Sequence, residues 1–87
     1  MKIDNSLIKD ILQQLEKVYP SSIESSDNIL PKYENRNEIL NHLFHCERLG
    51  WIEVTPIEID QRDIPVEYKY IRLTEKGKNY SDSLLGR

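Results

Sequence analysis

The sequence is poor in cysteine and lacks any long apolar run, and these shortages exclude two classes of protein. One cysteine, Cys46, cannot form a disulfide within the chain, so a disulfide scaffold is excluded and a reducing compartment is expected. No apolar run approaches the roughly 20 residues that cross a bilayer. The first residues, MKIDNSLIKD, do not resemble a secretory signal. A cytoplasmic protein without a membrane span is therefore the default expectation.

The residue patterns needed for catalysis and metal binding are also missing. The three glycines are scattered and form no phosphate-binding loop, and no nucleophile motif surrounds Ser81 or Ser83. His42 and Cys46 lie four residues apart, which on a helix supplies at most two zinc ligands. No second cluster of Cys or His completes a tetrahedral site. We therefore expect no enzymatic activity, no metal site and no cofactor.

Positive charge is in short supply as well. The chain has 12 Lys and Arg residues against 15 Asp and Glu residues, which gives a formal net charge of −3. This balance disfavours nucleic-acid binding, because neutralisation of phosphates by Lys and Arg supplies much of the affinity. The charges are unevenly spread, however: acidic residues gather between residues 56 and 67, and basic residues gather from residue 68 onward. The distribution of charge on the surface therefore matters more than the total.

Apolar residues at three-and-four spacing predict two helices in what we expect to be a single domain, residues 1–87. The 87 residues are 38% hydrophobic, close to the lower size at which one core holds without disulfides or metals. The first helix is predicted over residues 5–18, with a stripe from Leu7 to Val18 and an end before Pro20. The second is predicted over residues 35–49. Its apolar stripe is formed by Ile39, Leu40, Leu43, Phe44, Cys46 and Leu49.

The remaining sequence predicts a short irregular segment, a β-hairpin and a terminal helix. Between the two helices, Ser25 or Ser26 can cap a single helical turn, and Ile23 can belong to a short strand. After Gly50 the apolar period changes to two, and a polar turn at residues 60–63 separates two predicted strands. Pro56 suits an edge strand or a bulge. Thr74 can cap a last helix, in which Tyr80 and Leu84 share a face.

This order of elements, together with two segments, resembles the winged helix-turn-helix family. ILNHLFHCERLGWIEV resembles the third helix of that family leading into its first wing strand, and YIRLTEKGKNY resembles the second wing strand and its exit. The chain is most similar to short winged-helix proteins of prokaryotic genomes and mobile elements. The resemblance implies an α+β fold with a three-helix core, a two- or three-stranded antiparallel wing and a short C-terminal helix.

The resemblance also implies a function, namely binding of double-stranded DNA by a transcriptional regulator or mobile-element accessory factor. In that family the third helix enters the major groove with its N-terminal residues at the base edges. Arginine and asparagine can each make two hydrogen bonds to a base, and lysine or arginine can contact phosphates. The wing would lie beside the minor groove. The residues expected to contact DNA are Lys32, Asn35, Arg36, Asn37, Asn41, Arg48 and Arg62.

Two alternatives stay open at this point. The acidic residues around Arg62 should repel phosphates, so the domain could instead bind a protein partner through its acidic wing or its third helix. The polar residues of that helix could also form an ordinary solvated face. A homodimer through the face of Tyr80 and Leu84 would accompany the regulator hypothesis, with Lys69, Arg72, Lys76 and Lys78 as a candidate basic flank.

Overall fold

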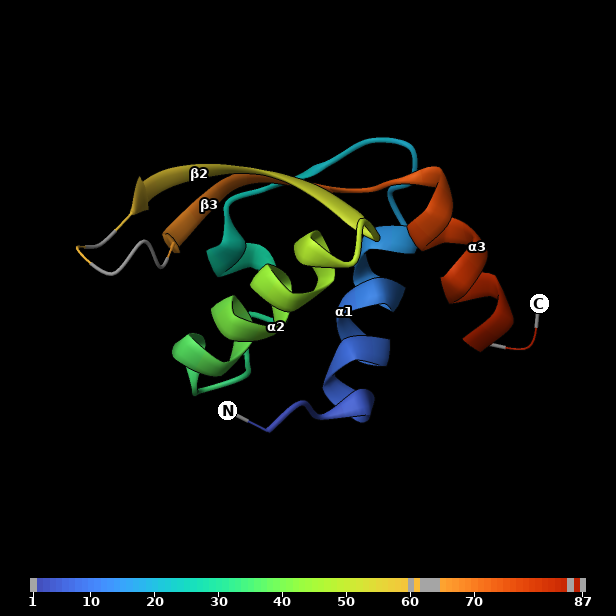
Figure 1. The fold of residues 1–87 in the computed structure, drawn as a ribbon, viewed down its shortest axis with the longest axis horizontal. Coiled ribbons are helices and arrows are strands. Elements are labelled where there is room, and N and C mark those ends of the chain that lie inside the picture. Colours follow the sequence, from blue (N-terminus) through green and yellow to red (C-terminus); the bar gives the residue numbers. More distant parts are fainter. Residues whose placement is uncertain (1, 60, 62–64, 85, 87) are drawn as a thin grey trace.

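The computed structural model describes residues 2–59, 61, 65–84 and 86, and over these residues the chain folds into helices packed on one antiparallel sheet (Figure 1). The predicted α+β class is confirmed, and the sheet has three strands. No helix among the described residues is long and apolar enough to cross a membrane. The elements in chain order are α1 (Asn5–Glu16), β1 (Ile23–Glu24), the 3-10 turn η1 (Ser26–Asn28), α2 (Arg36–Arg48), β2 (Ile52–Ile59), β3 (Pro65–Leu73) and α3 (Glu75–Leu84).

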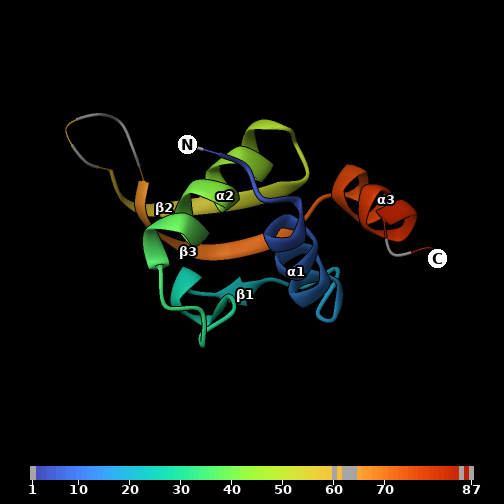
Figure 2. The same ribbon diagram turned by 90° about the horizontal axis from the view of Figure 1, so that it is seen from below.

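The sheet has the strand order β1-β3-β2, so β3 is central and pairs antiparallel with both neighbours. α1 and α2 lie under one face of this sheet, and α3 lies at one end (Figures 1 and 2). Ile71 of β3 pairs with Ile23 on one side and Val54 on the other, which places the short β1 segment in register with the long hairpin. The fold is therefore a helical layer against a small twisted sheet.

α1 forms as its pattern predicts, although it is shorter. The Asp4 side chain caps the start by accepting hydrogen bonds from the backbone N–H groups of Ser6 and Leu7. The helix ends at Glu16 rather than at residue 18, and Val18 is 37% exposed instead of buried. The core residues of the stripe are Leu7, Ile8, Ile11, Leu12 and Leu15.

α2 also matches its prediction in position but differs on one side chain. Asn35 is the N-cap and accepts a hydrogen bond from the Glu38 N–H. Leu43 and Cys46 are fully buried, whereas Phe44 lies only partly buried beneath the guanidinium of Arg48, 5.7 Å from the ring centroid. Phe44 and Leu49, both assigned to the apolar stripe, therefore lie at its outer margin, and Leu49 is 38% exposed. A residue adjacent to Leu43 points about 100° away around the helix.

A bulge in the hairpin decides which tyrosine enters the core. Thr55 pairs with Tyr70, but the next residue, Pro56, pairs with Tyr68, so Lys69 is an extra residue on β3. At this extra residue the regular alternation of β3 side chains between the two faces of the sheet is interrupted. Tyr68 is 1% exposed while Tyr70 is 42% exposed. The expectation that Pro56 suits an edge strand or bulge is confirmed, since β2 is an edge strand and its register shifts on both sides of the proline.

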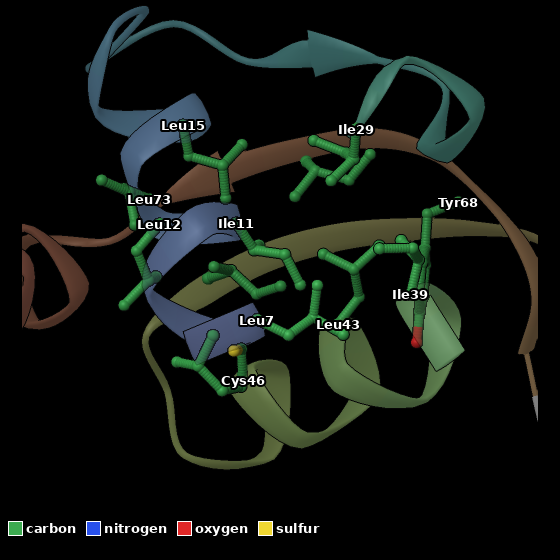
Figure 3. Packing of buried hydrophobic residues seen from close by; sticks show 13 residues of the cluster. Leu7, Ile11, Leu12, Leu15, Ile29, Ile39, Leu43, Cys46, Tyr68 and Leu73 are labelled. Carbon is green, nitrogen blue, oxygen red and sulfur yellow. The ribbon is translucent and has the colours of Figure 1, made fainter. Parts of the chain in front are cut away.

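The core lies between the two helices and the sheet (Figure 3). Buried leucine and isoleucine side chains from α1 and α2 meet Ile71 and Leu73 of β3, which are both fully buried. Each such side chain contributes roughly 1.5–3 kcal/mol by leaving water. The Cys46 thiol belongs to this core, and burial raises its pKa to about 12, so the thiol is unreactive at neutral pH.

The sequence LTEKG docks α3 on the junction between α2 and β2. The Thr74 N–H donates to the Trp51 carbonyl at 3.0 Å, and the Thr74 hydroxyl donates to the Gly50 carbonyl at 2.6 Å. That hydroxyl also accepts from the Gly77 N–H at 3.0 Å, which caps the helix. A Cβ on Gly77 would stand 1.9 Å from the Trp51 carbonyl oxygen. Glycine is therefore required by the close approach of α3 to that backbone.

Two side-chain contacts complete the attachment of α3. The Tyr80 ring stacks on Trp51, with ring centroids 3.9 Å apart. The fully buried Ser81 hydroxyl donates to the Glu16 carboxylate of α1 at 2.6 Å. The face predicted to carry Tyr80 and Leu84 is thus divided, because Tyr80 packs on the domain itself while Leu84 stays 38% exposed.

Candidate nucleic-acid interface

The segment between β1 and α2 is irregular, and its backbone is strained at two places. The predicted helical turn is present as the 3-10 turn η1, capped by the Ser25 hydroxyl, which accepts from the Asp27 N–H at 3.2 Å. Ser25 and Leu30 both have positive φ angles, 69° and 45°. Such angles are uncommon for residues other than glycine and persist only where surrounding contacts hold them.

The Ser25 N–H donates to the Lys69 carbonyl of β3 at 2.5 Å, and the side chain of Arg36 holds the part of the segment that contains Leu30. One terminal nitrogen, Nη1, donates to the carbonyl oxygens of Leu30 at 2.8 Å and Tyr33 at 3.1 Å. The other, Nη2, donates to the carbonyl oxygens of Ser26 at 2.7 Å and Ile29 at 2.8 Å. Four carbonyl groups of an otherwise irregular segment are thus satisfied by one guanidinium. Arg36 fastens the segment to the first residue of α2.

This geometry matters for the predicted contact between Arg36 and a guanine base. A bidentate contact needs two N–H groups on one edge of the guanidinium. In the structure all four terminal N–H groups point to backbone carbonyls, which leaves the single Nε–H. The terminal nitrogens of Arg36 are therefore engaged within the domain and do not face the outer surface of α2.

The other predicted residues of α2 do share an outward face. Asn37, Asn41 and Arg48 follow one another at spacings of four and seven residues, which places them along one side of the helix together with Phe44. Asn37 and Arg48 are exposed, and Asn41 is partly exposed. Arg48 lies at the C-terminal end of α2, where its guanidinium covers the Phe44 ring. α2 thus presents a row of amide groups followed by a cation.

The segment that precedes α1 lies beside the start of this row. Lys2, Asn35, Asn37, Glu38 and Asn41 line one shallow depression. The group combines an ammonium donor, a carboxylate acceptor and three amides that can both donate and accept. These are the side-chain types that pair with base edges in the major groove.

Two of the predicted cations lie away from this depression. Lys32 is exposed on the segment that Arg36 fastens, and it lines a separate depression with Asp10 and Gln14 of α1. Arg62, which was predicted to contact DNA from the wing, lies outside the described residues. The adjacent hairpin pairs Glu58 with Glu67 across the two strands.

The candidate basic flank is largely engaged in internal contacts. Arg72 pairs with Glu53 on the neighbouring strand. Lys78 pairs with Asp82 at 2.5 Å and lies 3.7 Å from Glu16. The hydrogen bond to Asp82 raises the pKa of Lys78, Glu16 adds to the effect, and burial opposes it. Among the four predicted flank residues, only Lys69 and Lys76 have no carboxylate partner in the structure described here.

Contacts around Glu38 fix one wall of the depression. Burial raises the pKa of Tyr33, and the hydrogen bond from its hydroxyl to Glu38 raises it further. The Glu38 carbonyl lies 2.7 Å from Nδ1 of His42, which is fully buried. The Glu38 side chain therefore faces Tyr33 of the fastened segment, while its carbonyl contacts His42 within α2.

Sequence reasoning missed Lys2, His42 and the structural role of Arg36. Lys2 and His42 are 40 residues apart in the sequence, so no local pattern connects them. An arginine directly after an N-cap is expected to be solvated, and the sequence alone does not show that the preceding segment folds over its side chain. Among the described residues, no three His, Cys, Asp or Glu side chains gather in a position to hold a metal ion.

Comparison with known proteins gives no further guidance on these residues. No family model, no curated protein and no solved structure matches this chain.

Proposed function

We propose that this protein is a winged-helix DNA-binding protein that places α2 in the major groove. The observation that carries the proposal is the outward row of Asn37 and Asn41 on α2, with Lys2 and Asn35 beside it and Arg48 beyond it. Amides at this spacing can reach successive base edges, and flanking cations can reach phosphates. Such a protein would act as a transcriptional regulator or as an accessory factor of a mobile element.

The arrangement of the elements supports this proposal. The winged helix-turn-helix family has three helices followed by a hairpin, and here α1, η1 and α2 precede the hairpin of β2 and β3. α2 lies at the surface of the domain, with one side on the core and the other side open to a partner (Figure 1). In the proposed complex, the fastened segment precedes the recognition helix, as the turn does in helix-turn-helix proteins.

A second candidate function uses the same face of α2 to bind a protein. The observation that favours it is the partly exposed pair of Phe44 and Arg48, because aromatic residues and arginine are enriched in protein interfaces. Internal pairing of Arg36, Arg72 and Lys78 also leaves few cations for phosphates. The two candidates differ in their dependence on salt and on asparagine side chains.

The proposal is tested by fluorescence anisotropy with labelled mixed-sequence duplex DNA, at low salt and then at increasing salt. We expect binding that weakens steeply with salt, because bound phosphates release counterions. After selection of a preferred site, Asn41→Ala should weaken binding to that site by about 1–3 kcal/mol, the value of one bidentate base contact. Asn79→Ala, an exposed asparagine of α3, is the matched control and should bind like the wild type.

The outcomes separate the two candidates. Absence of binding at low salt would overturn the DNA proposal. Binding that neither Asn41→Ala nor Asn79→Ala weakens would place the contact elsewhere on the domain. Loss of a protein partner on Phe44→Ala, without any DNA affinity, would favour the second candidate.

A further inference from the structure

A buried histidine holds the segment before α1 against α2. The backbone N–H of Asp4 donates to Nε2 of His42 at 3.0 Å, across 38 residues of sequence. On the other side of the ring, Nδ1 lies 2.7 Å from the Glu38 carbonyl oxygen. His42 is fully buried on the second turn of α2. The ring therefore joins two segments that have no other reason in sequence to meet.

The two contacts define which nitrogen carries the proton. A carbonyl oxygen can only accept, so Nδ1 must carry hydrogen, and a backbone amide can only donate, so Nε2 must be bare. The ring is thus the neutral Nδ1–H tautomer. A phenylalanine or leucine at this position would fill space but could not accept the Asp4 N–H.

The consequence of this contact lies two residues earlier, at Lys2. Lys2 lines the depression with Asn35, Asn37 and Asn41, and it lines an adjoining one with Asp4, Asn5 and Glu38. Its side chain is exposed and makes no ion pair within the described part of the chain. It is the cation of this region that approaches the three asparagines, since the guanidinium of Arg36 points inward.

We infer that Lys2 is a DNA phosphate contact of the α2 surface and that His42 is the residue that positions it. The inference rests on the proposed function. In this arrangement the amides of α2 face base edges, while the ammonium of Lys2 reaches the phosphate backbone at the groove edge. His42 does not touch DNA. It acts through the Asp4 amide by keeping the Lys2–Asn5 segment beside α2.

The test is a double-mutant cycle on DNA affinity, with Lys2→Ala, His42→Phe and the combined variant. Lys2→Ala should lower affinity about three- to tenfold at low salt and reduce the slope of log affinity against log salt by about 1, as expected for one lost phosphate contact. His42→Phe should lower the DNA affinity by a similar factor, although Lys2 is still present. The combined variant should be no weaker than His42→Phe, because both changes remove the same contact. Lys9→Ala, an exposed lysine of α1, is the charge-matched control.

A separate measurement checks the contact without DNA. Hydrogen exchange by NMR should show the Asp4 amide protected in the wild type and rapidly exchanging in His42→Phe. If His42→Phe fails to fold, the wild-type exchange rate and the Lys2→Ala salt slope still decide the inference. An unprotected Asp4 amide would overturn the positioning role of His42.

The inference and the proposed function fail in different ways. If the wild type binds DNA and Lys2→Ala keeps the full salt slope, only the role of Lys2 is overturned. Additive losses in the cycle would show that His42 does not act through Lys2. If the wild type binds no DNA, the proposed function itself is overturned.

Discussion

Arg36 is the residue on which the segment before α2 depends. Its guanidinium satisfies the carbonyl groups of Ser26, Ile29, Leu30 and Tyr33. Hydrogen bonds to charged groups contribute about 1.5–3 kcal/mol each, and bonds sharing one side chain are not additive. We predict that Arg36→Ala lowers the free energy of unfolding by about 2–4 kcal/mol, measured by urea denaturation.

Two further variants make this prediction specific. Compared with Arg36→Ala, Arg36→Lys should restore less than half of the lost free energy of unfolding. One ammonium group cannot donate in the two directions of the guanidinium fork. Asn37→Ala, at the next exposed position of α2, should leave stability nearly unchanged. A variant Arg36→Ala that is as stable as the wild type would contradict the fastening role and reopen the contact between Arg36 and DNA.

At the scale of elements, the docking of α3 depends on the absence of a side chain at Gly77. Any Cβ there would collide with the Trp51 backbone, at 1.9 Å from its carbonyl oxygen. We predict that Gly77→Ala destabilises the protein by about 2 kcal/mol or more, because the helix must shift to relieve the overlap. The stacking of Tyr80 on Trp51 should loosen as well.

The readout for this prediction is the fluorescence of Trp51, the single tryptophan of the chain. Gly77→Ala should shift its emission toward that of an exposed indole, while Asn79→Ala, exposed on the same helix, should not. An unchanged spectrum and unchanged stability in Gly77→Ala would mean that α3 does not need this close approach.

Elements with a strong local signal were predictable, and elements fixed by distant contacts were not. The stripes of α1 and α2, the hairpin and the Thr74 cap follow from spacing and capping chemistry within each segment. The sequence hints at the bulge only through the adjacent apolar residues Tyr70 and Ile71, which break the alternation of the strand. The extra residue, Lys69, is identified only by the pairing of Pro56 with Tyr68.

The candidate site shows the same division. The outward row of Asn37 and Asn41 follows from helical period, so the sequence was sufficient to predict it. The inward turn of Arg36 depends on the path of the segment before it. The approach of Lys2 depends on a hydrogen bond between Asp4 and His42, which lies outside the reach of any local pattern.

At the scale of the whole molecule, two buried acids make stability depend on alkaline pH. Burial raises the pKa of Cys46 from 9.0 to about 12. Burial, with the charge of Glu47 adding to it, raises the pKa of Tyr68 from 10.0 to about 12. Both groups are neutral when protonated, so the unfolded chain loses these protons at lower pH than the folded chain. The stability they contribute is full below pH 9.0 for Cys46 and below 10.0 for Tyr68, and it is lost as pH rises toward about 12.

We therefore predict that the free energy of unfolding falls between about pH 9 and pH 12, by up to about 1.4 kcal/mol per pH unit for each titrating group. The free energy of unfolding of Tyr68→Phe should fall less steeply above about pH 10, since one of the two titrating groups is gone. It should also keep wild-type stability at neutral pH, because the buried Tyr68 hydroxyl has no hydrogen-bond partner within the described structure. Urea denaturation across this range measures both effects, and an equally steep fall in Tyr68→Phe would contradict the assignment.

The DNA-binding surface that we propose is the outer face of α2 with the Lys2–Asn5 segment beside it. The most direct measurement is an NMR titration of the 15N-labelled wild type with duplex DNA, following each backbone amide. We expect chemical-shift changes concentrated at residues 2–5 and 35–48, with little change in α3. Shifts confined to α3 or to the open face of the sheet, or no shifts at low salt, would contradict it.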